Sequence, residues 1–228
     1  MESDEKKSQE TAEKSTFSDE TVEKSTFSDE VKNFYKGELK EIFATFFKNP
    51  IDGILAIFRN PSEKAYTNSL ILYGSVFLLY FIGSLILAGD ARKYIDFPVF
   101  LKIGLMPVIM MFSISLIAFL IKSLSGKPDF KNELQTGGIC GIPISLLLIL
   151  ALIIRLFSDE NIMRLVNNPA NAGTVVLLLL LYILLMLINV FQQSLKASDT
   201  KDAIAWYVAP ASILTAIYLT FQISKVLF

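Results

Sequence analysis

The chain has 228 residues, of which 53% are hydrophobic and 19% are charged, and its formal net charge is −1. Soluble domains average about 45–50% apolar and about 25% charged residues, so this composition points away from an ordinary soluble domain, and the small net charge points away from nucleic acid. The sequence has no histidine and one cysteine, so it lacks the commonest general base and metal ligand and cannot form an internal disulfide.

The first thirty residues are nearly all Glu, Asp, Lys, Ser and Thr, and they contain a tandem repeat. The decapeptide "TAEKSTFSDE" at 11–20 is followed by "TVEKSTFSDE" at 21–30, and only Ala12 and Val22 differ. Such a segment cannot bury enough apolar surface to offset its chain entropy, so we predict a disordered acidic tail over 1–30. A doubled docking or phosphorylation motif is the alternative interpretation.

Residues 31–48 show helical periodicity, because apolar residues recur every three or four positions and lysines align on another side. The Asn49-Pro50 pair ends this helix, since the residue before a proline disfavours the α-helical conformation. An aromatic stripe beside lysines, next to a membrane span, is typical of an amphipathic helix in the headgroup plane, and we assign 31–66 to such an interfacial segment. Packing against the transmembrane bundle and docking of a partner are the alternatives. The candidate membrane-interface residues of this segment are Phe34, Phe43, Phe46 and Phe47.

Five apolar blocks follow, each near the roughly 20 residues needed to cross a bilayer. A backbone in lipid must satisfy its own hydrogen bonds, so we predict that every block is a helix. Trp206 and Tyr207, at the entrance of the last block, suit a membrane interface. The predicted fold class is therefore all-α integral membrane, with five transmembrane helices after the amphipathic helix and the disordered tail. The membrane domain covers 67–228, with spans at about 70–88, 98–121, 137–154, 173–190 and 203–228.

Small residues and prolines mark the spans where we expect close packing. The third span begins with a G-x-x-x-G pair. Small residues let two helix backbones approach closely, which matters in lipid because the hydrophobic effect does not drive transmembrane helices to associate. A proline lies within three of the five spans and bends the helix there. We predict that these residues serve helix packing, and a hinge or groove between bent helices is the alternative. The helix-packing and hinge candidates are Gly137, Gly138, Gly141, Pro143, Pro107 and Pro210.

Motifs that carry chemistry are missing from the sequence: it has no H-E-x-x-H, G-x-S-x-G, C-x-x-C or P-loop pattern. The five predicted spans contain no Asp, Glu or His, and an intramembrane ionisable group is the usual mark of an ion pathway. Polar residues such as Asn189, Gln192 and Gln193 more often join helices than catalyse. We therefore expect no catalytic residues, no metal site, no cofactor and no enzymatic activity.

Three segments carry a resemblance to a known family: "FFKNPIDGILAIFRNPSEKAY" before the first span, "GKPDFKNELQTGGICGIPISLLL" at the third, and "SDTKDAIAWYVAPASILTAIYLTF" at the last. They resemble segments of the Yip family, the Ypt/Rab-interacting membrane proteins, and most closely its bacterial relatives. The resemblance covers about 44–228. The chain lacks the Asp-Leu-Tyr-Gly-Pro motif that eukaryotic trafficking members carry before their first span. The resemblance implies five spans with a cytosolic N-terminus, no enzymatic activity, and a bacterial inner membrane rather than a eukaryotic endomembrane.

These observations favour a non-enzymatic multi-pass membrane protein that acts as a scaffold or adaptor in membrane organisation or trafficking-like processes. A permease or channel component that moves a small solute through the bundle is the alternative, and a membrane enzyme is the third hypothesis. The expected partners are membrane lipids, a protein bound through the N-terminal tail and amphipathic helix, and other subunits in a homo- or hetero-oligomer. Nucleic acid is not expected.

The lysine and arginine distribution predicts the topology, which cysteine labelling can test. Eight Lys or Arg residues near the span ends lie on the side of the N-terminus and six on the other, so we expect a cytoplasmic N-terminus and an external C-terminus. The first apolar block begins near residue 68, so we expect the first span to be an uncleaved anchor. A membrane-impermeant thiol reagent should label a C-terminal cysteine in intact cells, and an N-terminal cysteine only after permeabilisation. Labelling of both termini from one side would contradict the odd number of spans.

Overall fold

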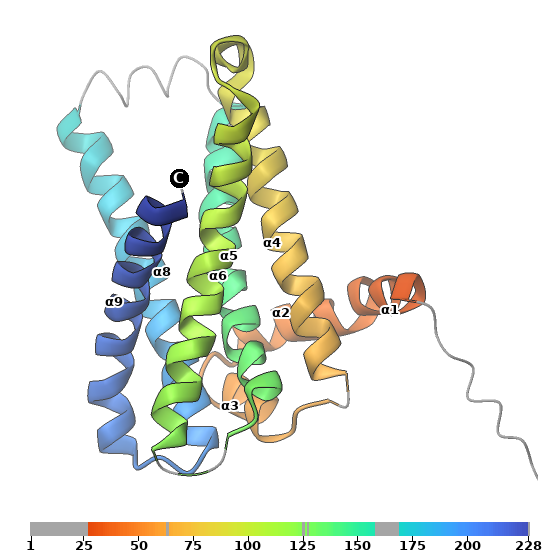
Figure 1. Ribbon diagram of the computed structural model, residues 1–228, viewed down its shortest axis with the longest axis vertical. Helices are drawn as coiled ribbons and strands as arrows, with labels where there is room; N and C mark the ends of the chain where they lie inside the picture. The colour runs from red at the N-terminus through yellow and green to blue at the C-terminus, as the bar shows by residue number, and fades with distance from the viewer. Residues whose placement is uncertain (1–26, 63, 125, 127, 158–168, 228) are drawn as a thin grey trace, which may run out of the picture.

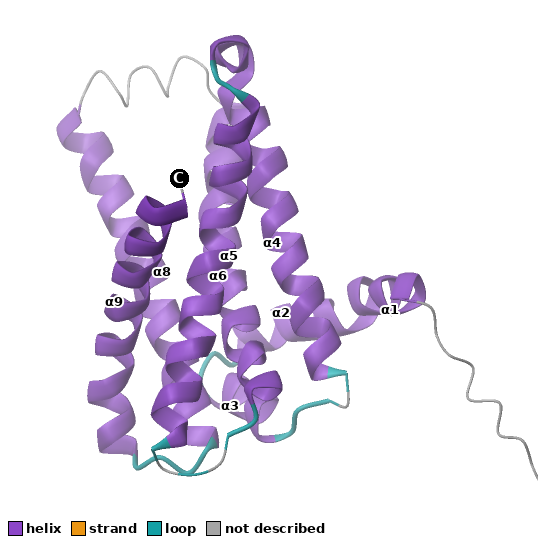
Figure 2. Ribbon diagram, in the orientation of Figure 1, coloured by secondary structure: helices purple, strands orange, loops and turns teal. Residues whose placement is uncertain are grey.

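The computed structural model describes residues 27–62, 64–124, 126, 128–157 and 169–227, and every regular element in these ranges is a helix (Figure 1, Figure 2). Apolar side chains without a strand-like alternation explain this, because a helix satisfies its own backbone in an apolar surrounding. The elements are α1 (Phe27–Asn33), the π-helical turn η1 (Phe34–Glu38), α2 (Leu39–Lys48), α3 (Asp52–Arg59), α4 (Ala65–Ala88), the 3₁₀ turn η2 (Gly89–Tyr94), α5 (Phe97–Ser123), α6 (Phe130–Phe157), α8 (Pro169–Ala197) and α9 (Asp202–Leu227).

Five of these helices are long and apolar enough to cross a membrane, which confirms the predicted fold class. The spanning segments contain between 24 and 30 residues, more than the roughly 20 that a hydrocarbon layer requires. They belong to α4 with η2, to α5, to α6, to α8 and to α9. The chain is therefore a multi-pass helical membrane protein.

The third spanning helix begins earlier than the sequence predicts. It starts at Phe130 rather than at 137, because Asp129 caps it. The Asp129 carboxylate accepts a hydrogen bond from the backbone N–H of Lys131 at 3.1 Å, and its carbonyl accepts from the N–H of Glu133 at 3.2 Å. The additional turns place Glu133 inside α6. The predicted span, 137–154, contains no acidic residue, but the longer helix that the structure shows contains Glu133.

Helix α6 lies at the centre of the bundle. Its most apolar window is 56% buried, against 22% for α8 and 28% for α4. Helices α4, α5 and α6 pack against one another, α9 packs on α5, and α8 packs on α6 and α9 (Figure 1). The upper part of α8 leans away from the other helices (Figure 1). The bundle is thus tight around α4, α5 and α6 and looser along α8.

The glycines of α6 allow the close contact with α4 and α5. A Cβ atom at Gly137 would collide with the carbonyl oxygen of Met111 and with the hydroxyls of Tyr73 and Ser115. At Gly141 a Cβ would lie 2.8 Å from the Met111 Cε atom. The Gly137 N–H also donates to Ser115 Oγ at 3.1 Å. The G-x-x-x-G pair therefore lies in the helix contact rather than against lipid.

The N-terminal helices α1, η1 and α2 run into one another, because the residues at both junctions keep helical backbone angles. Helix α1 begins at Phe27, so the last four residues of the predicted tail are helical. Asp29 and Glu30 lie in its first turn, where negative charge is favourable to the helix dipole. The remainder of the predicted disordered tail, 1–26, lies outside the described residues.

Substitution of Gly137 by Ala tests the helix contact. The added methyl group would overpack the α5–α6 contact, so we expect a loss of about 1–3 kcal/mol in stability. The reporter is Cys140, a fully buried thiol, and the measurement is the temperature at which it reacts with a thiol-specific dye in detergent micelles. The matched control is Gly74→Ala, because a Cβ at Gly74 has nothing within 4 Å. Equal melting of both variants would contradict the assigned contact.

Candidate functional site

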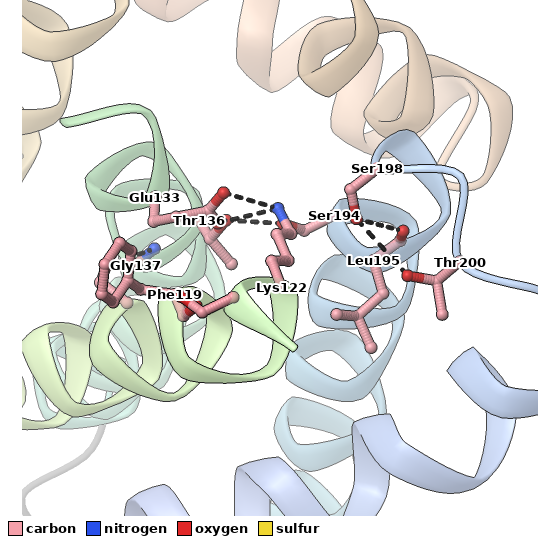
Figure 3. A network of polar contacts seen from close by, with 11 residues as sticks. Phe119, Lys122, Glu133, Thr136, Gly137, Ser194, Leu195, Ser198 and Thr200 are labelled. Atoms are coloured by element: carbon pink, nitrogen blue, oxygen red, sulfur yellow. Dashed lines mark hydrogen bonds and ion pairs between the residues drawn. The ribbon is translucent and has the colours of Figure 1, made fainter. Parts of the chain in front are cut away.

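A buried ion pair joins three helices at the end of the bundle where α5 ends and α6 begins (Figure 3). The Nζ atom of Lys122 donates to both carboxylate oxygens of Glu133, at 3.0 and 2.8 Å, and to Ser194 Oγ of α8 at 2.9 Å. The two charged side chains are only 11% and 7% exposed. All three ammonium hydrogens of Lys122 therefore have acceptors.

Hydroxyl groups close the network around this pair. Thr136 Oγ1 and Ser194 Oγ share a hydrogen bond of 2.6 Å, and Thr136 Oγ1 also donates to Glu133 Oε2 at 3.4 Å. We call Lys122, Glu133, Thr136 and Ser194 the polar clamp. Buried charges are tolerated when they are paired and hydrogen-bonded, and this set meets both conditions. The arrangement suits holding helices together rather than transferring a proton or attacking a substrate.

A polar cavity of about 330 Å³ adjoins the polar clamp. Its wall includes Lys122 and Glu133, Pro61 after α3, Asp129 at the start of α6, and Ser198 after α8. Segments far apart in the sequence thus meet at one end of the bundle. The cavity lets water reach one side of the clamp.

The N-terminal helices dock on the bundle at this same end (Figure 1). Asn189 Nδ2 in α8 donates to the carbonyl oxygen of Pro50 at 2.7 Å, and Gln193 Nε2 donates to Asn189 Oδ1 at 3.1 Å. Ile54 of α3 is fully buried. We call residues 27–59 the N-terminal platform. The turn between α2 and α3 is thereby bound to α8.

A second set of contacts ties the N-terminal platform to α4. Asn68 donates to the carboxylate of Glu38, and the hydroxyls of Tyr35 and Ser75 form a hydrogen bond. Phe34 is 1% exposed and packs with Ile71 and Leu72 of α4. The platform therefore contacts the bundle through both polar and apolar groups.

The predicted interface aromatics lie in different places. Phe34 and Phe46 are buried within the protein, Phe43 is partly buried, and Phe47 is 51% exposed. The stripe thus divides into a face that packs on the bundle and a face that does not. At the start of α9, Trp206 and Tyr207 are 65% and 82% exposed.

The helix-packing candidates are spread over the bundle. Gly137 and Gly141 lie one and two turns from Glu133 on α6, and a Cβ at Gly138 would lie 3.3 Å from Ser69 Cα of α4. The three prolines lie inside their helices, in α5, α6 and α9. Pro107 lines an apolar cavity that is separate from the polar clamp. Ile144, the neighbour of Pro143 in sequence, lines the same cavity. The remaining proline candidate is Pro210 of α9.

Sequence reasoning missed the ion pair. It placed Lys122 in a loop and Glu133 before the third span. One signal could have found them: Asp129 follows a proline and is a favoured N-cap, so the helix that it begins would include Glu133 in its first turn. A carboxylate inside a membrane helix requires a partner, and Lys122 is the basic residue at the end of the preceding helix.

Comparisons with known proteins find no matching family model, curated protein or solved structure. Among the residues that the structure describes, no group of three or more His, Cys, Asp or Glu side chains is placed to hold a metal ion. The site is therefore interpreted from its own geometry, as a polar clamp and a docked platform on a multi-pass membrane bundle.

Removal of one partner of the ion pair should destabilise the bundle. Lys122→Met leaves the Glu133 carboxylate buried and unpaired, and we expect a loss of about 2–3 kcal/mol. This is below the roughly 3–5 kcal/mol typical of dry pairs, because the adjoining cavity admits water. The double variant Lys122→Met/Glu133→Leu removes both charges and should recover part of the loss. The measurement is thermal melting reported by the Cys140 thiol.

The control for this prediction is the exposed pair of Lys93 and Asp90, whose side chains are 68% and 100% exposed. Lys93→Met should leave the melting temperature unchanged, because an exposed pair contributes little. If Lys122→Met melts like Lys93→Met, the polar clamp does not hold the helices.

Proposed function

We propose that this multi-pass membrane protein is a non-enzymatic scaffold or adaptor of the Yip type, which binds a protein partner at the membrane surface through its N-terminal platform. The observation that carries the proposal is that the platform is docked by one face and exposed on the other. The five spanning helices and the helical segment before the first of them are what the Yip resemblance implies, and they support it.

Rigid docking makes the exposed face of the platform suitable for recognition. The hydrogen bonds from Asn189 and Asn68 and the burial of Ile54 hold the helices in place, so a partner would not have to order them. Phe47 is 51% exposed, and Tyr35 is still 47% exposed although its hydroxyl contacts Ser75 of α4. Aromatic side chains are enriched at the centres of protein interfaces. The platform therefore presents anchors on a preorganised surface.

In this proposal the platform lies at the cytoplasmic surface of a bacterial inner membrane. The lysine excess near this end of the spans supports that orientation. Lys32, Lys36 and Lys40 are exposed and recur every four residues, so they can meet anionic headgroups while the aromatic side chains lie at the interface. The amphipathic character predicted for 31–48 would then serve membrane contact and partner contact along the same exposed surface.

The large cavity among the spans supports a scaffold over a permease. It is lined almost wholly by apolar side chains, including Ile103, Met106 and Leu184. A small polar solute would lose its hydration there without gaining hydrogen bonds.

Photo-crosslinking in the native membrane tests the scaffold function. A photoreactive phenylalanine analogue at Tyr35 or Phe47 should yield a discrete protein adduct. The matched control is Tyr94, which is 91% exposed at the opposite end of the bundle and should yield no such adduct. A second substitution, Phe47→Glu, should lower the adduct yield at Tyr35 at least about tenfold, because a truncated aromatic anchor typically costs about 2 kcal/mol. Adducts with lipid alone, or the same proteins at all three positions, would overturn the proposal.

A further inference from the structure

An apolar cavity of about 360 Å³ lies among α4, α5, α6, α8 and α9, apart from the polar clamp. Its wall includes Met106, Ile144, Leu184 and two polar residues, Tyr80 and Thr220. Both hydroxyl groups already donate hydrogen bonds within the protein: Tyr80 donates to the carbonyl oxygen of Ile144 at 2.6 Å, and Thr220 donates to that of Ala216 at 2.7 Å. The surface that the cavity presents is therefore hydrocarbon.

The cavity opens sideways between helices that cross the membrane. Three residues of its rim are partly accessible, with Ile103 at 38%, Leu180 at 47% and Phe221 at 56% exposure. Cavities lined by apolar side chains stay dry. An empty space of this size would forfeit the dispersion contacts of all its walls. Within a bilayer, the hydrocarbon that can enter from the side is a lipid acyl chain.

Two lysines lie beyond the cavity at one end of the bundle. Lys102 precedes Met106 of α5 by four residues, and Lys225 follows Phe221 of α9 by four residues. Residues four apart share a helix face about 6 Å apart along the axis. Because α5 begins and α9 ends toward the end of the bundle opposite the N-terminal platform, both lysines lie on that side (Figure 1). Their charges complement an anionic headgroup.

We propose that this cavity holds an acyl chain of an anionic membrane phospholipid, with Lys102 and Lys225 on the side of the headgroup. The lipid belongs to the leaflet opposite the N-terminal platform. The long apolar run of α8, which leans away from the bundle, forms one side of the entrance. This site is independent of the proposed scaffold function, because it involves neither the platform nor the polar clamp.

Photoactivatable phosphatidylglycerol tests the cavity. The full-length protein is reconstituted in phosphatidylcholine vesicles that contain phosphatidylglycerol with a diazirine in its acyl chain, and adducts are mapped by mass spectrometry. We expect adducts on cavity residues of α5 and α8. Leu184→Trp fills the cavity and should lower the yield of these adducts about tenfold. This factor corresponds to the loss of burial of about two methylene groups of the acyl chain. The matched control, Leu185→Trp, lies on the neighbouring outward position, 57% exposed, and should leave them unchanged.

The headgroup is tested by competition between that probe and a phosphatidylcholine probe with the same acyl chain. Lys102→Gln and Lys225→Gln should each lower the preference for phosphatidylglycerol roughly fivefold, as expected for one basic residue near a membrane surface. Lys201→Gln, at the other end of α9, is the control and should change nothing. The Cys140 melting assay checks that every variant is folded.

Three results would overturn the proposal. In the first, exposed α8 residues such as Leu177 are labelled as strongly as the cavity residues in the wild-type protein. This comparison does not depend on the folding of any variant. Another is equal labelling in Leu184→Trp and Leu185→Trp. The third is a crosslink from cavity residues to a second copy of the chain in place of lipid, which would make the cavity a protein interface.

Discussion

The requirement that a buried charge be paired shapes one end of this bundle. Lys122 and Glu133 lie in helices that are otherwise almost wholly apolar, and each would be costly alone. Their contact joins α5 to α6, and the hydrogen bond from Lys122 to Ser194 adds α8. Once α8 is held there, Asn189 faces the turn at Pro50 and fixes the N-terminal platform. The docking of the turn between α2 and α3 on α8 therefore depends on the position that the ion pair gives to α8.

The two ends of the bundle are held by different forces. At the platform end, directional hydrogen bonds and close glycine contacts allow one arrangement of α4, α5, α6 and α8. Toward the other end, α8 has few buried residues, and the wall of the apolar cavity is held mostly by dispersion contacts. Lipid tails are as apolar as leucine, so they can replace such helix contacts at little cost. A rigid recognition surface at one end and a lipid site at the other follow naturally from this asymmetry.

Much of the fold could be predicted from hydrophobicity alone. The five spans, the end of α2 at Lys48 before Asn49-Pro50, and the prolines inside helices follow from local sequence. The ion pair did not follow, because a hydropathy pattern ends a span where apolar residues end, whereas the Asp129 cap begins α6 two turns earlier. The division of the aromatic stripe was also beyond the sequence. Phe46 and Phe47 are adjacent and chemically identical, and only the position of the bundle decides that the first is buried.

The sequence by itself determined that the chain is a bundle of membrane-crossing helices, because the solvation of backbone and side chains by lipid or water is a local property of each segment. It also determined where small residues permit helices to approach. The tertiary structure alone decided which charges meet, which face of the platform is covered and where the spans leave a cavity. These features depend on the relative positions of residues far apart in the chain, such as Pro50 and Asn189, and no local preference encodes that distance.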